Sequence, residues 1–498
     1  MDINKTLQTG ILPASGGIVY FVGIKGTGVC ALAELMRNVG FKVSGSDTHE
    51  IFYTDAILKE LEIPYYENFN AERINKNIDI VIHSLAYSAS SNPELARAEE
   101  IGIPVMNYPQ ALGAWSAEFD STGICGVHGK TTTTAICGVL MRAAGLPAQI
   151  LAGSAALDFG LRSTLTLGSK YFIAETCEYR EKFLHFRPKR IILTSVESDH
   201  QDYFPTYESI RDAFVKYCRL LPEGGRLIYC ADNPGASEVA HIIKSESNGI
   251  EFIPYGFTSS GDYRITSYDV EDKTAVFTLS GFKDKFKIPV PGSHEALNAA
   301  AAMALTVSLA KDEFGTAEGS LLNEDKILSI KNALCNFKST KRRYEVLGER
   351  SGIVFIDDYG HHPTAIKTTL AGIKSFYPSG RLVVSFMSHT YTRTAALFDE
   401  FASAFADADI LFLHKIYSSA RENYNGAIDG KALFEKTASA RSGKTYYTEE
   451  PDDAFAPLCG ILKSGDVFLT LGAGSNWSLG VKLFNYFSSV NNAEVHHD

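Results

Sequence analysis

A single loop decides how this chain folds: Gly126-Val127-His128-Gly129-Lys130-Thr131-Thr132-Thr133-Thr134. A short run of small and apolar residues, 123–125, precedes the loop, and residues 135–141 after it have the apolar spacing of a helix. In a turn from strand to helix, glycines let backbone N–H groups approach phosphate oxygens, and the helix N-terminus adds a favourable partial charge. We therefore predict a nucleotide triphosphate site, with Lys130 at the outer phosphates and the Thr131 hydroxyl at a Mg²⁺ ion.

The glycine spacing of this loop is irregular. The strict phosphate-loop pattern is G-x-x-x-x-G-K-[ST], but Ile124 stands where its first glycine would fall, and glycines occupy positions 123 and 126 instead. This irregular spacing disfavours a small GTPase and favours a ligase that uses ATP to activate a carboxylate. The alternative is a glycine turn that only caps an ordinary helix.

The size and charge of the chain limit its class. Its 498 residues are too many for one ordinary core and suggest about three domains. The composition, 45% apolar and 21% charged, is that of an average globular protein. A net charge of −11 argues against a general nucleic-acid or anionic-membrane binder, so local basic groups and backbone donors must hold any phosphate.

Cysteine usage and hydropathy predict the compartment. The eight cysteines are scattered and form no C-x-x-C pair, which is typical of buried free thiols in a reducing compartment. No segment approaches the about 18 uninterrupted apolar residues of a membrane span. We expect a cytoplasmic enzyme with no membrane insertion and no nucleic-acid partner.

The first segment has the pattern of a nucleotide-binding strand–helix–strand unit. Residues 17–22 are a continuous apolar run of the buried parallel-strand type, followed by a glycine turn at 23–28 and a helical stretch at 29–39. Strand 41–44 then leads to Ser46-Asp47. The spacing G-x-x-G-x-G differs from the G-x-G-x-x-G fingerprint of NAD enzymes, so a dehydrogenase is disfavoured.

The second segment places acidic and imidazole groups after predicted strands. Strand 171–174 ends at Glu175, and strand 190–194 leads to Asp199-His200. Open α/β sheets bind ligands beyond the carboxyl ends of their strands, and carboxylate and imidazole can both coordinate a divalent cation. Residues 263–290 alternate like a small antiparallel patch, and an alanine-rich helix follows.

The third segment restarts the alternation of strands and helices. Strand 353–356 ends at the motif Asp357-Asp358-Tyr359-Gly360-His361-His362-Pro363, and strand 382–386 ends near His389-Thr390-Tyr391-Thr392-Arg393-Thr394. A basic cluster that includes Arg342 and Arg343 marks the start of this segment.

Seven motifs in order resemble those of the Mur ligase family of peptidoglycan synthesis, over essentially the whole chain. They are Gly23 to Gly28 with Ser46-Asp47, Gly126 to Thr134, Ala174 to Glu178, Asp199 to Tyr203, Arg342 to Glu345, Asp357 to Pro363, and Tyr391 to Thr394. The resemblance implies an α/β protein of three domains. These are an N-terminal Rossmann-like UDP-sugar-binding domain at 1–117, a central P-loop ATPase-like domain with a mainly parallel sheet at 118–337, and a C-terminal Rossmann-like amino-acid-binding domain at 338–498.

The resemblance also implies a reaction. An ATP-dependent ligase of this family phosphorylates the carboxylate of UDP-N-acetylmuramate, and the amine of a small amino acid, with L-alanine as first choice, attacks the acyl phosphate. The products are the amide, ADP and phosphate. ATP and Mg²⁺ are the implied cofactors, and a monomer or weak homodimer is expected. Such chemistry needs positioned cations and metal ligands rather than a protein nucleophile.

Site residues follow from the matching motifs. The implied catalytic residues are Lys130, His200, Arg343, His361 and Arg393, and the implied metal ligands are Thr131, Glu175 and His200. ATP contacts are expected from Gly126, His128, Gly129, Lys130, Thr131, Thr132, His294, Asn298, Arg343 and Asp358. Substrate contacts are expected from Gly26, Thr27, Gly28, Ser46, Asp47 and Ser84 for the UDP-sugar, and from Tyr359, His361 and Arg393 for the amino acid.

Several positions depart from the family pattern, among them Leu85 and Ser195, and two alternatives stay open. Val127 replaces a threonine of the loop, Glu295 replaces an asparagine expected at adenine, and Thr390 replaces an arginine three positions before Arg393. The first alternative is a recycling ligase that adds a preformed peptide to UDP-N-acetylmuramate. The second is a degenerate member of the family that binds nucleotide without catalysis.

Overall fold

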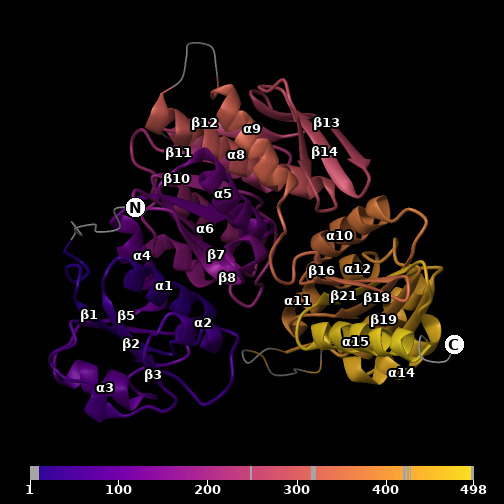
Figure 1. Ribbon diagram of the computed structural model, residues 1–498, viewed down its shortest axis with the longest axis horizontal. Helices are drawn as coiled ribbons and strands as arrows, with labels where there is room; N and C mark the ends of the chain where they lie inside the picture. The colour runs from indigo at the N-terminus through magenta and orange to yellow at the C-terminus, as the bar shows by residue number, and fades with distance from the viewer. Residues whose placement is uncertain are drawn as a thin grey trace.

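The chain folds into three α/β domains in a row along the sequence (Figure 1). The structure is a computed structural model that describes residues 10–246, 249–315, 321–418, 422, 426 and 428–494. Within these residues the strands form three sheets, one in each predicted segment. The prediction of three α/β domains is confirmed, while the exact limits at 117 and 337 stay predictions.

The N-terminal sheet is parallel throughout, with the strand order β3-β2-β1-β4-β5. This order is that of the dinucleotide-binding folds, in which ligands bind at the carboxyl end of the first strand. The glycine turn lies at that end, between β1 and α1. The elements are β1 (Ile18–Val22), α1 (Thr27–Asn38), β2 (Lys42–Ser46), α2 (Thr54–Glu60), β3 (Tyr65–Tyr66), η1 (Ala71–Arg73), β4 (Ile80–His83), α3 (Pro93–Glu100), β5 (Val105–Asn107) and α4 (Tyr108–Ala117).

The central sheet has the order β15-β14-β13-β12-β11-β10-β6-β9-β7-β8 and is parallel from β13 to β7. Antiparallel pairs close both edges, and the patch expected at 263–290 forms β13, β14 and β15. Its strands are β6 (Asp120–Cys125), β7 (Ala148–Ala156), β8 (Arg162–Thr166), β9 (Tyr171–Glu175), β10 (Arg190–Leu193), β11 (Arg226–Cys230), β12 (Glu251–Gly256), β13 (Tyr263–Glu271), β14 (Thr274–Leu279) and β15 (Lys285–Ile288).

Side-chain alternation along β10 divides the central core into two layers. Ile191 and Leu193 pack in the same core as the helices α6 and α7, while Ile192 packs in the core of α5 and α8. Every alanine of α8 is fully buried, and these small side chains let the helix lie close to α5. The helices are α5 (Lys130–Ala144), η2 (Leu157–Phe159), η3 (Tyr179–His185), α6 (Tyr207–Cys218), α7 (Pro234–Glu246), α8 (Ser293–Phe314) and α9 (Glu324–Cys335).

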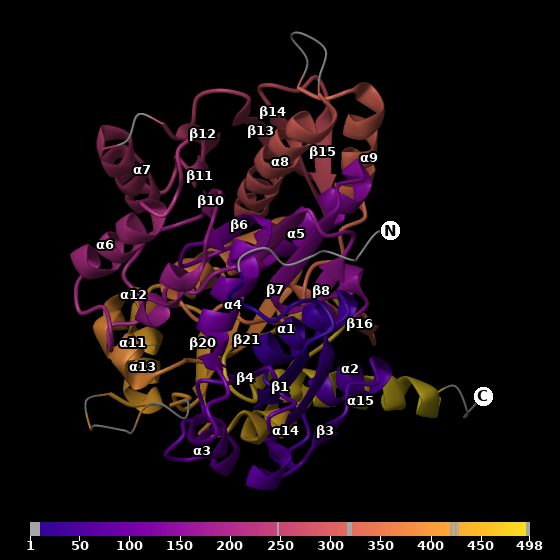
Figure 2. The same ribbon diagram turned by 90° about the vertical axis from the view of Figure 1, so that its left-hand side faces the viewer.

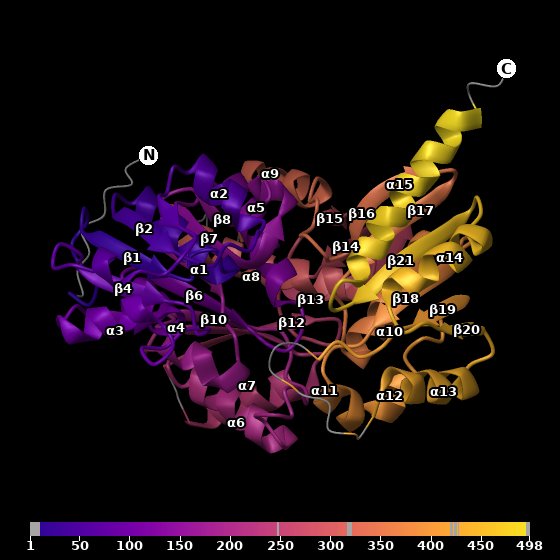
Figure 3. The same cartoon turned by 90° about the horizontal axis from the view of Figure 1, so that it is seen from below.

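The C-terminal sheet has the order β16-β17-β21-β18-β19-β20, with only the β16 edge antiparallel among the described strands. Helices cover both faces (Figure 3), as in the Rossmann-like domain that was predicted. The elements are β16 (Glu345–Arg350), β17 (Ile353–Asp358), α10 (Pro363–Phe376), β18 (Arg381–Met387), α11 (Tyr391–Ala396), α12 (Phe398–Ala402), β19 (Ile410–Leu413), α13 (Gly430–Ala440), β20 (Lys444–Tyr447), η4 (Pro451–Ala454), α14 (Phe455–Ile461), β21 (Asp466–Gly472) and α15 (Asn476–Glu494).

The central domain contacts both of the others, and Figures 1 and 2 show it above them. On the N-terminal side, Arg162 at the edge strand β8 forms ion pairs of 2.5 Å with Glu34 of α1 and 2.6 Å with Glu60 of α2. On the C-terminal side, Arg393 of α11 pairs with Asp199 at 2.8 Å, and the Thr364 hydroxyl of α10 donates to Glu197 at 3.0 Å. The carboxyl ends of the central strands therefore face the C-terminal domain.

Candidate active site

A cavity of about 530 Å³ lies between the central and C-terminal domains. The phosphate loop, the ends of the central strands, the start of α8 and the C-terminal motifs all contribute to its wall. The structure brings most of the predicted site residues together here. Those that line the cavity are His128, Gly129, Lys130, Thr131, Thr132, Glu175, His200, His294, Asn298, Arg343, Asp358, Tyr359, His361 and Arg393.

The phosphate loop runs from the end of β6 to the start of α5, as its sequence predicts. Gly126 and Gly129 have φ angles of +134° and +80°, which favour glycine. A Cβ atom on Gly126 would lie 2.1 Å from the Thr194 hydroxyl. The Ser195 hydroxyl accepts a hydrogen bond of 2.9 Å from the His128 N–H and so anchors the loop. The turn therefore has the shape that a phosphate cradle needs.

Lys130 forms a buried ion pair with Glu178. Its Nζ lies 3.0 Å from Glu178 Oε2 and also donates to the Gly126 carbonyl. Burial opposes the charge on Lys130, yet the carboxylates of Glu178 and Glu175 hold its pKa above the ordinary value. Burial likewise opposes the charge on Glu178, but Lys130 and His200 keep its pKa below the ordinary value. The pair is thus ionised at neutral pH, and a phosphate would have to share Lys130 with this carboxylate.

The predicted metal ligands fall into two adjacent groups. In the first, the Thr131 hydroxyl donates to Glu175 Oε2 at 2.8 Å, and the Gly153 N–H donates to the same oxygen. In the second, His200 lies with Glu178 and Asp199, whose candidate ligand atoms all lie within 4.8 Å of one another. Oxygen-rich sets of this kind suit Mg²⁺, which keeps water and phosphate oxygens as its other ligands.

Glu178 is a site residue that the sequence prediction missed. It belongs to the motif at 174–178, but the prediction selected only Glu175 as the acidic ligand. Its carboxylate, only 3% exposed, lies between Lys130 and His200, 3.5 Å from His200 Nε2. Its place three residues after Glu175 was the available signal, because a second buried acid beside a phosphate loop needs a cation.

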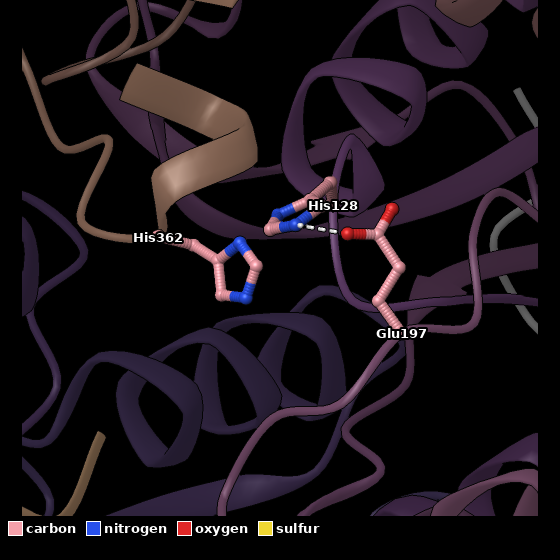
Figure 4. Close-up of side chains that lie close together, drawn as sticks. All are labelled: His128, Glu197 and His362. Atoms are coloured by element: carbon pink, nitrogen blue, oxygen red, sulfur yellow. Dashed lines mark ion pairs between the residues drawn. The ribbon is translucent and has the colours of Figure 1, made fainter. Parts of the chain in front are cut away.

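A second cluster joins the two domains at the phosphate loop. Figure 4 shows His128, Glu197 and His362 converging from three separate segments, with His128 Nε2 3.6 Å from Glu197 Oε2. The His128 and His362 rings lie 4.8 Å apart. His362, which the sequence prediction also passed over, caps α10, because its Nδ1 accepts the Thr364 N–H at 3.3 Å.

The cap fixes the chemistry of His362. A neutral imidazole has one nitrogen lone pair, and Nδ1 uses it on Thr364, so Nε2 carries the proton and is a donor. Burial, with His128 next in effect, lowers the pKa of His362 to about 4, which keeps the ring neutral. Its Nε2 is buried and has no hydrogen-bond partner among the described residues. In this tautomer His362 is a hydrogen-bond donor of the cavity wall rather than a metal ligand.

The predicted amino-acid pocket is built from Tyr359, His361 and Arg393. The His361 ring lies 4.7 Å from that of Tyr359, and its Nδ1 is 2.8 Å from the Tyr359 carbonyl. Burial, assisted by the charge of Arg393, holds the pKa of His361 well below its ordinary value. A neutral imidazole beside a buried guanidinium can accept a proton from an incoming amine, so the group fits an amino-acid site.

Arg393 and Asp199 form a buried pair across the domain junction. Although burial opposes its charge, Arg393 holds the pKa of Asp199 well below the usual range of a carboxyl. The Arg393 side chain is 4% exposed. This contact links two residues 194 positions apart, and it brings the C-terminal domain onto the metal-ligand loop.

The expected nucleotide contacts near α8 and β17 are engaged with the protein itself. Asn298 donates to Glu295 Oε2 at 3.1 Å, and His294 Nε2 lies 3.4 Å from Glu295 Oε1. Burial lowers the pKa of His294, but Glu295 outweighs it and raises that pKa above the ordinary value. Asp358 accepts the N–H groups of Tyr344 and Gly360 at 2.8 and 2.7 Å. Their roles toward adenine and ribose stay predictions.

Two of the N-terminal residues predicted for the UDP-sugar line a second cavity, between the N-terminal and central domains. Thr27 and Gly28 line a cavity of about 200 Å³, whose wall shares Glu175 and Cys177 with the first. A Cβ on Gly28 would lie 2.7 Å from the Tyr108 ring, so the turn needs glycine there. The two cavities meet at Glu175, which is where the ends of two substrates could be joined.

Three of the N-terminal residues have protein partners of their own. Asp47 accepts the Lys25 N–H of the glycine turn at 2.7 Å. The buried Ser46 hydroxyl donates to the buried Glu94, and the contact of Ser46 to substrate stays a prediction. Ser84 bonds its own chain, with its N–H donated to the Val22 carbonyl. The sequence had indicated the position of these residues but not the direction of their side chains.

The fold and the site define a nucleotide-dependent enzyme made of three α/β domains. Its cationic side chains Lys130, Arg343 and Arg393 lie at the junction of the second and third domains. The chain belongs to the Mur ligase family. It matches the Mur ligase family catalytic domain at residues 18–120, the Mur ligase middle domain at 124–306, and the Mur ligase glutamate ligase domain at 342–474.

Individual relatives cover nearly the whole chain. A UDP-N-acetylmuramate–L-alanine ligase of Treponema pallidum is 47% identical over 97% of this chain and 99% of its own. The crystal structure of UDP-N-acetylmuramate–alanine ligase from Thermotoga maritima, 23% identical, superposes with a TM-score of 0.72 over 95% of this chain and 99% of that one. A murein peptide ligase of Psychrobacter arcticus, also 23% identical, gives a TM-score of 0.61 over 95% and 99%. The two structures confirm the fold.

Membrane insertion was not expected from the hydropathy of the sequence. Among the described residues, the helices are all too short or too polar to span a bilayer.

Proposed function

We propose that this protein is an ATP-dependent ligase that joins L-alanine to UDP-N-acetylmuramate in peptidoglycan precursor synthesis. The observation that carries the proposal is the 47% identity, over nearly the full length of both chains, to a relative named for that reaction. The single cavity that holds the phosphate loop, the metal-ligand groups and Arg393 supports it, because all three reactants must meet.

The charged residues of the cavity can be assigned to the phosphates of ATP and to Mg²⁺. Lys130 and the loop N–H groups would hold the outer phosphates of ATP, and Arg343 would approach them from the start of the C-terminal domain. Thr131 and Glu175, and His200 with Glu178, would hold Mg²⁺, which when bound would supply positive charge to the phosphates. The Nε2–H of His362 would donate to a phosphoryl oxygen.

The amino acid would bind on the C-terminal side of the same cavity. Arg393 would hold its carboxylate, and neutral His361 would accept the proton that the attacking amine loses. The amine must reach the acyl carbon from this side, since the phosphate occupies the loop side. We place the reaction in the cytoplasm, where ATP is available.

One assay tests the proposal: phosphate release from ATP with UDP-N-acetylmuramate and each candidate amino acid in turn. Turnover with L-alanine, and weaker turnover with glycine or L-serine, is the expected result. Turnover only with a preformed peptide would replace the proposal by the recycling reaction, against which the buried setting of Arg393 argues. No turnover with any acceptor would favour a non-catalytic role.

A further inference from the structure

Arg393 is already occupied by the protein. Its Nε and Nη2 each lie 2.8 Å from Asp199 Oδ1, and its Nη1 lies 3.1 Å from His389 Nδ1. A free carboxylate prefers the same paired N–H groups of a guanidinium that Asp199 now uses. An amino acid that binds Arg393 must therefore compete with Asp199 for it.

Asp199 has a second set of neighbours on its other side. Its Oδ2 lies 3.8 Å from His200 Nε2, and its side chain belongs to the group of candidate metal ligands with His200 and Glu178. A small turn of the side chain would move the carboxylate from the guanidinium toward that group. Asp199 thus stands between the amino-acid site and a metal site, within reach of both.

We propose that Asp199 is a positioning residue that exchanges partners: it holds Arg393 until the amino-acid carboxylate takes the guanidinium, and it then turns to His200 and Glu178. This inference rests on the proposed ligase function. Amino-acid binding and divalent-metal binding then favour each other. The amino acid releases Asp199 from Arg393 to join the metal group, and a metal ion draws Asp199 away from the guanidinium that the amino acid needs. Such coupling is reciprocal: the metal must tighten amino-acid binding by the factor by which the amino acid tightens metal binding.

The variant Asp199→Asn separates this role from a merely structural one. Asparagine has the same shape and can still accept a hydrogen bond from Arg393, but it competes without charge. The KM for L-alanine should fall about tenfold, since a charge-assisted pair is replaced by a neutral one. The kcat should fall at the same time, because the metal group has lost a carboxylate. If Asp199 only supported the fold, KM would rise as kcat fell.

The matched control is Asp202→Asn in the same loop. The Asp202 carboxylate accepts the Tyr179 hydroxyl at 2.7 Å instead of contacting Arg393, so the KM for L-alanine should stay at the wild-type value. A KM that falls equally in both variants would reflect the general loss of negative charge and would overturn the proposal.

A binding measurement on the wild-type protein needs no variant. With UDP-N-acetylmuramate present and ATP absent, the affinity for Mn²⁺, followed by electron paramagnetic resonance, should rise when L-alanine is added. The affinity for L-alanine, followed by calorimetry, should rise by the same factor when Mn²⁺ is added. In Asp199→Asn both factors should approach one.

Two further results would overturn the proposal: a wild-type Mn²⁺ affinity that L-alanine leaves unchanged, or a KM for L-alanine in Asp199→Asn that equals or exceeds the wild-type value. Failure of the proposed function looks different. In that case the wild-type protein itself would release no phosphate with any amino acid.

Discussion

The two junctions of the central domain are built on different principles. The N-terminal junction is closed by Arg162, Glu34 and Glu60, all of them outside the two cavities. The C-terminal junction is closed by Asp199 with Arg393 and by Glu197 with Thr364, and these four residues all line the reaction cavity. The ion pairs of the first junction lie away from both cavities and can stay fixed during the reaction, whereas the contacts of the second lie in the wall of the reaction cavity and must respond to the ligands that enter it.

The largest effect should come from Lys130→Ala, which changes the reaction cavity at the C-terminal junction. It removes the cation of the phosphate loop and leaves the carboxylate of Glu178 unpaired, so kcat should fall about a thousandfold or more. Binding of UDP-N-acetylmuramate, measured by calorimetry, should persist, because that ligand is assigned to the N-terminal side. Loss of both catalysis and UDP-N-acetylmuramate binding would show that this ligand does not bind independently of the phosphate loop.

The next effect tests the fixed side. Arg162→Ala leaves Glu34, 6% exposed, without its cation, and should lower the free energy of unfolding by about 3 kcal/mol. At saturating substrates kcat should change little, since the reaction cavity is untouched. Arg162→Lys, measured in the same urea titration, keeps the charge and should recover part of the stability. A large fall of kcat in Arg162→Ala would show that the N-terminal junction also takes part in the reaction.

Acid should weaken the C-terminal domain through His414. Burial lowers the pKa of this imidazole to about 4, while its Nε2 lies 2.7 Å from the Ser385 hydroxyl. Between pH 6.5 and 4 the unfolded chain binds a proton that the folded chain refuses, so stability falls as the pH falls through this window. From pH 7 to pH 5 the loss should be about 2 kcal/mol. Thermal unfolding of wild type and His414→Gln checks the sign, since the variant should lose less on acidification.

The smallest effect concerns His362. In His362→Asn the side-chain oxygen can still cap α10, but the Nε2–H donor is lost, so kcat should fall about tenfold while the melting temperature stays within a few degrees. Steady-state kinetics and a thermal scan give the two values. His362→Gln, whose amide reaches farther, is the matched control and should retain more of the activity. An unchanged kcat in His362→Asn would remove this residue from the reaction.

The sequence was informative where function depends on local backbone shape. The phosphate loop and the glycine turn at residues 23–28 can be predicted from the sequence, because a strand, glycines and a helix start are consecutive in the chain. The three α/β domains follow from the same alternation. The antiparallel edge at 263–290 was also visible as strict alternation of side chains.

Contacts between domains were beyond the sequence. Asp199 and Arg393 are 194 positions apart, and nothing in either motif indicates that they pair. Glu178 comes three residues after Glu175 and His362 follows His361, and only their contacts and burial in the folded chain show that they belong to the site. Ser46 lies at the end of β2, as its sequence predicts, but only the structure shows that its hydroxyl bonds the buried Glu94.

The close packing of α5 and α8 has a consequence for the nucleotide. Both helices begin at the reaction cavity, α5 at Lys130 and α8 at Ser293. The Thr133 hydroxyl of α5 donates to Asn298 Oδ1 of α8 at 3.2 Å. The alanines of α8, Ala299 to Ala302, are fully buried, so a methyl group added to one that faces α5 would push the two helices apart. The packing of these small side chains therefore sets the distance between the phosphate loop and the start of α8, where the contacts to the phosphates and to the base are predicted.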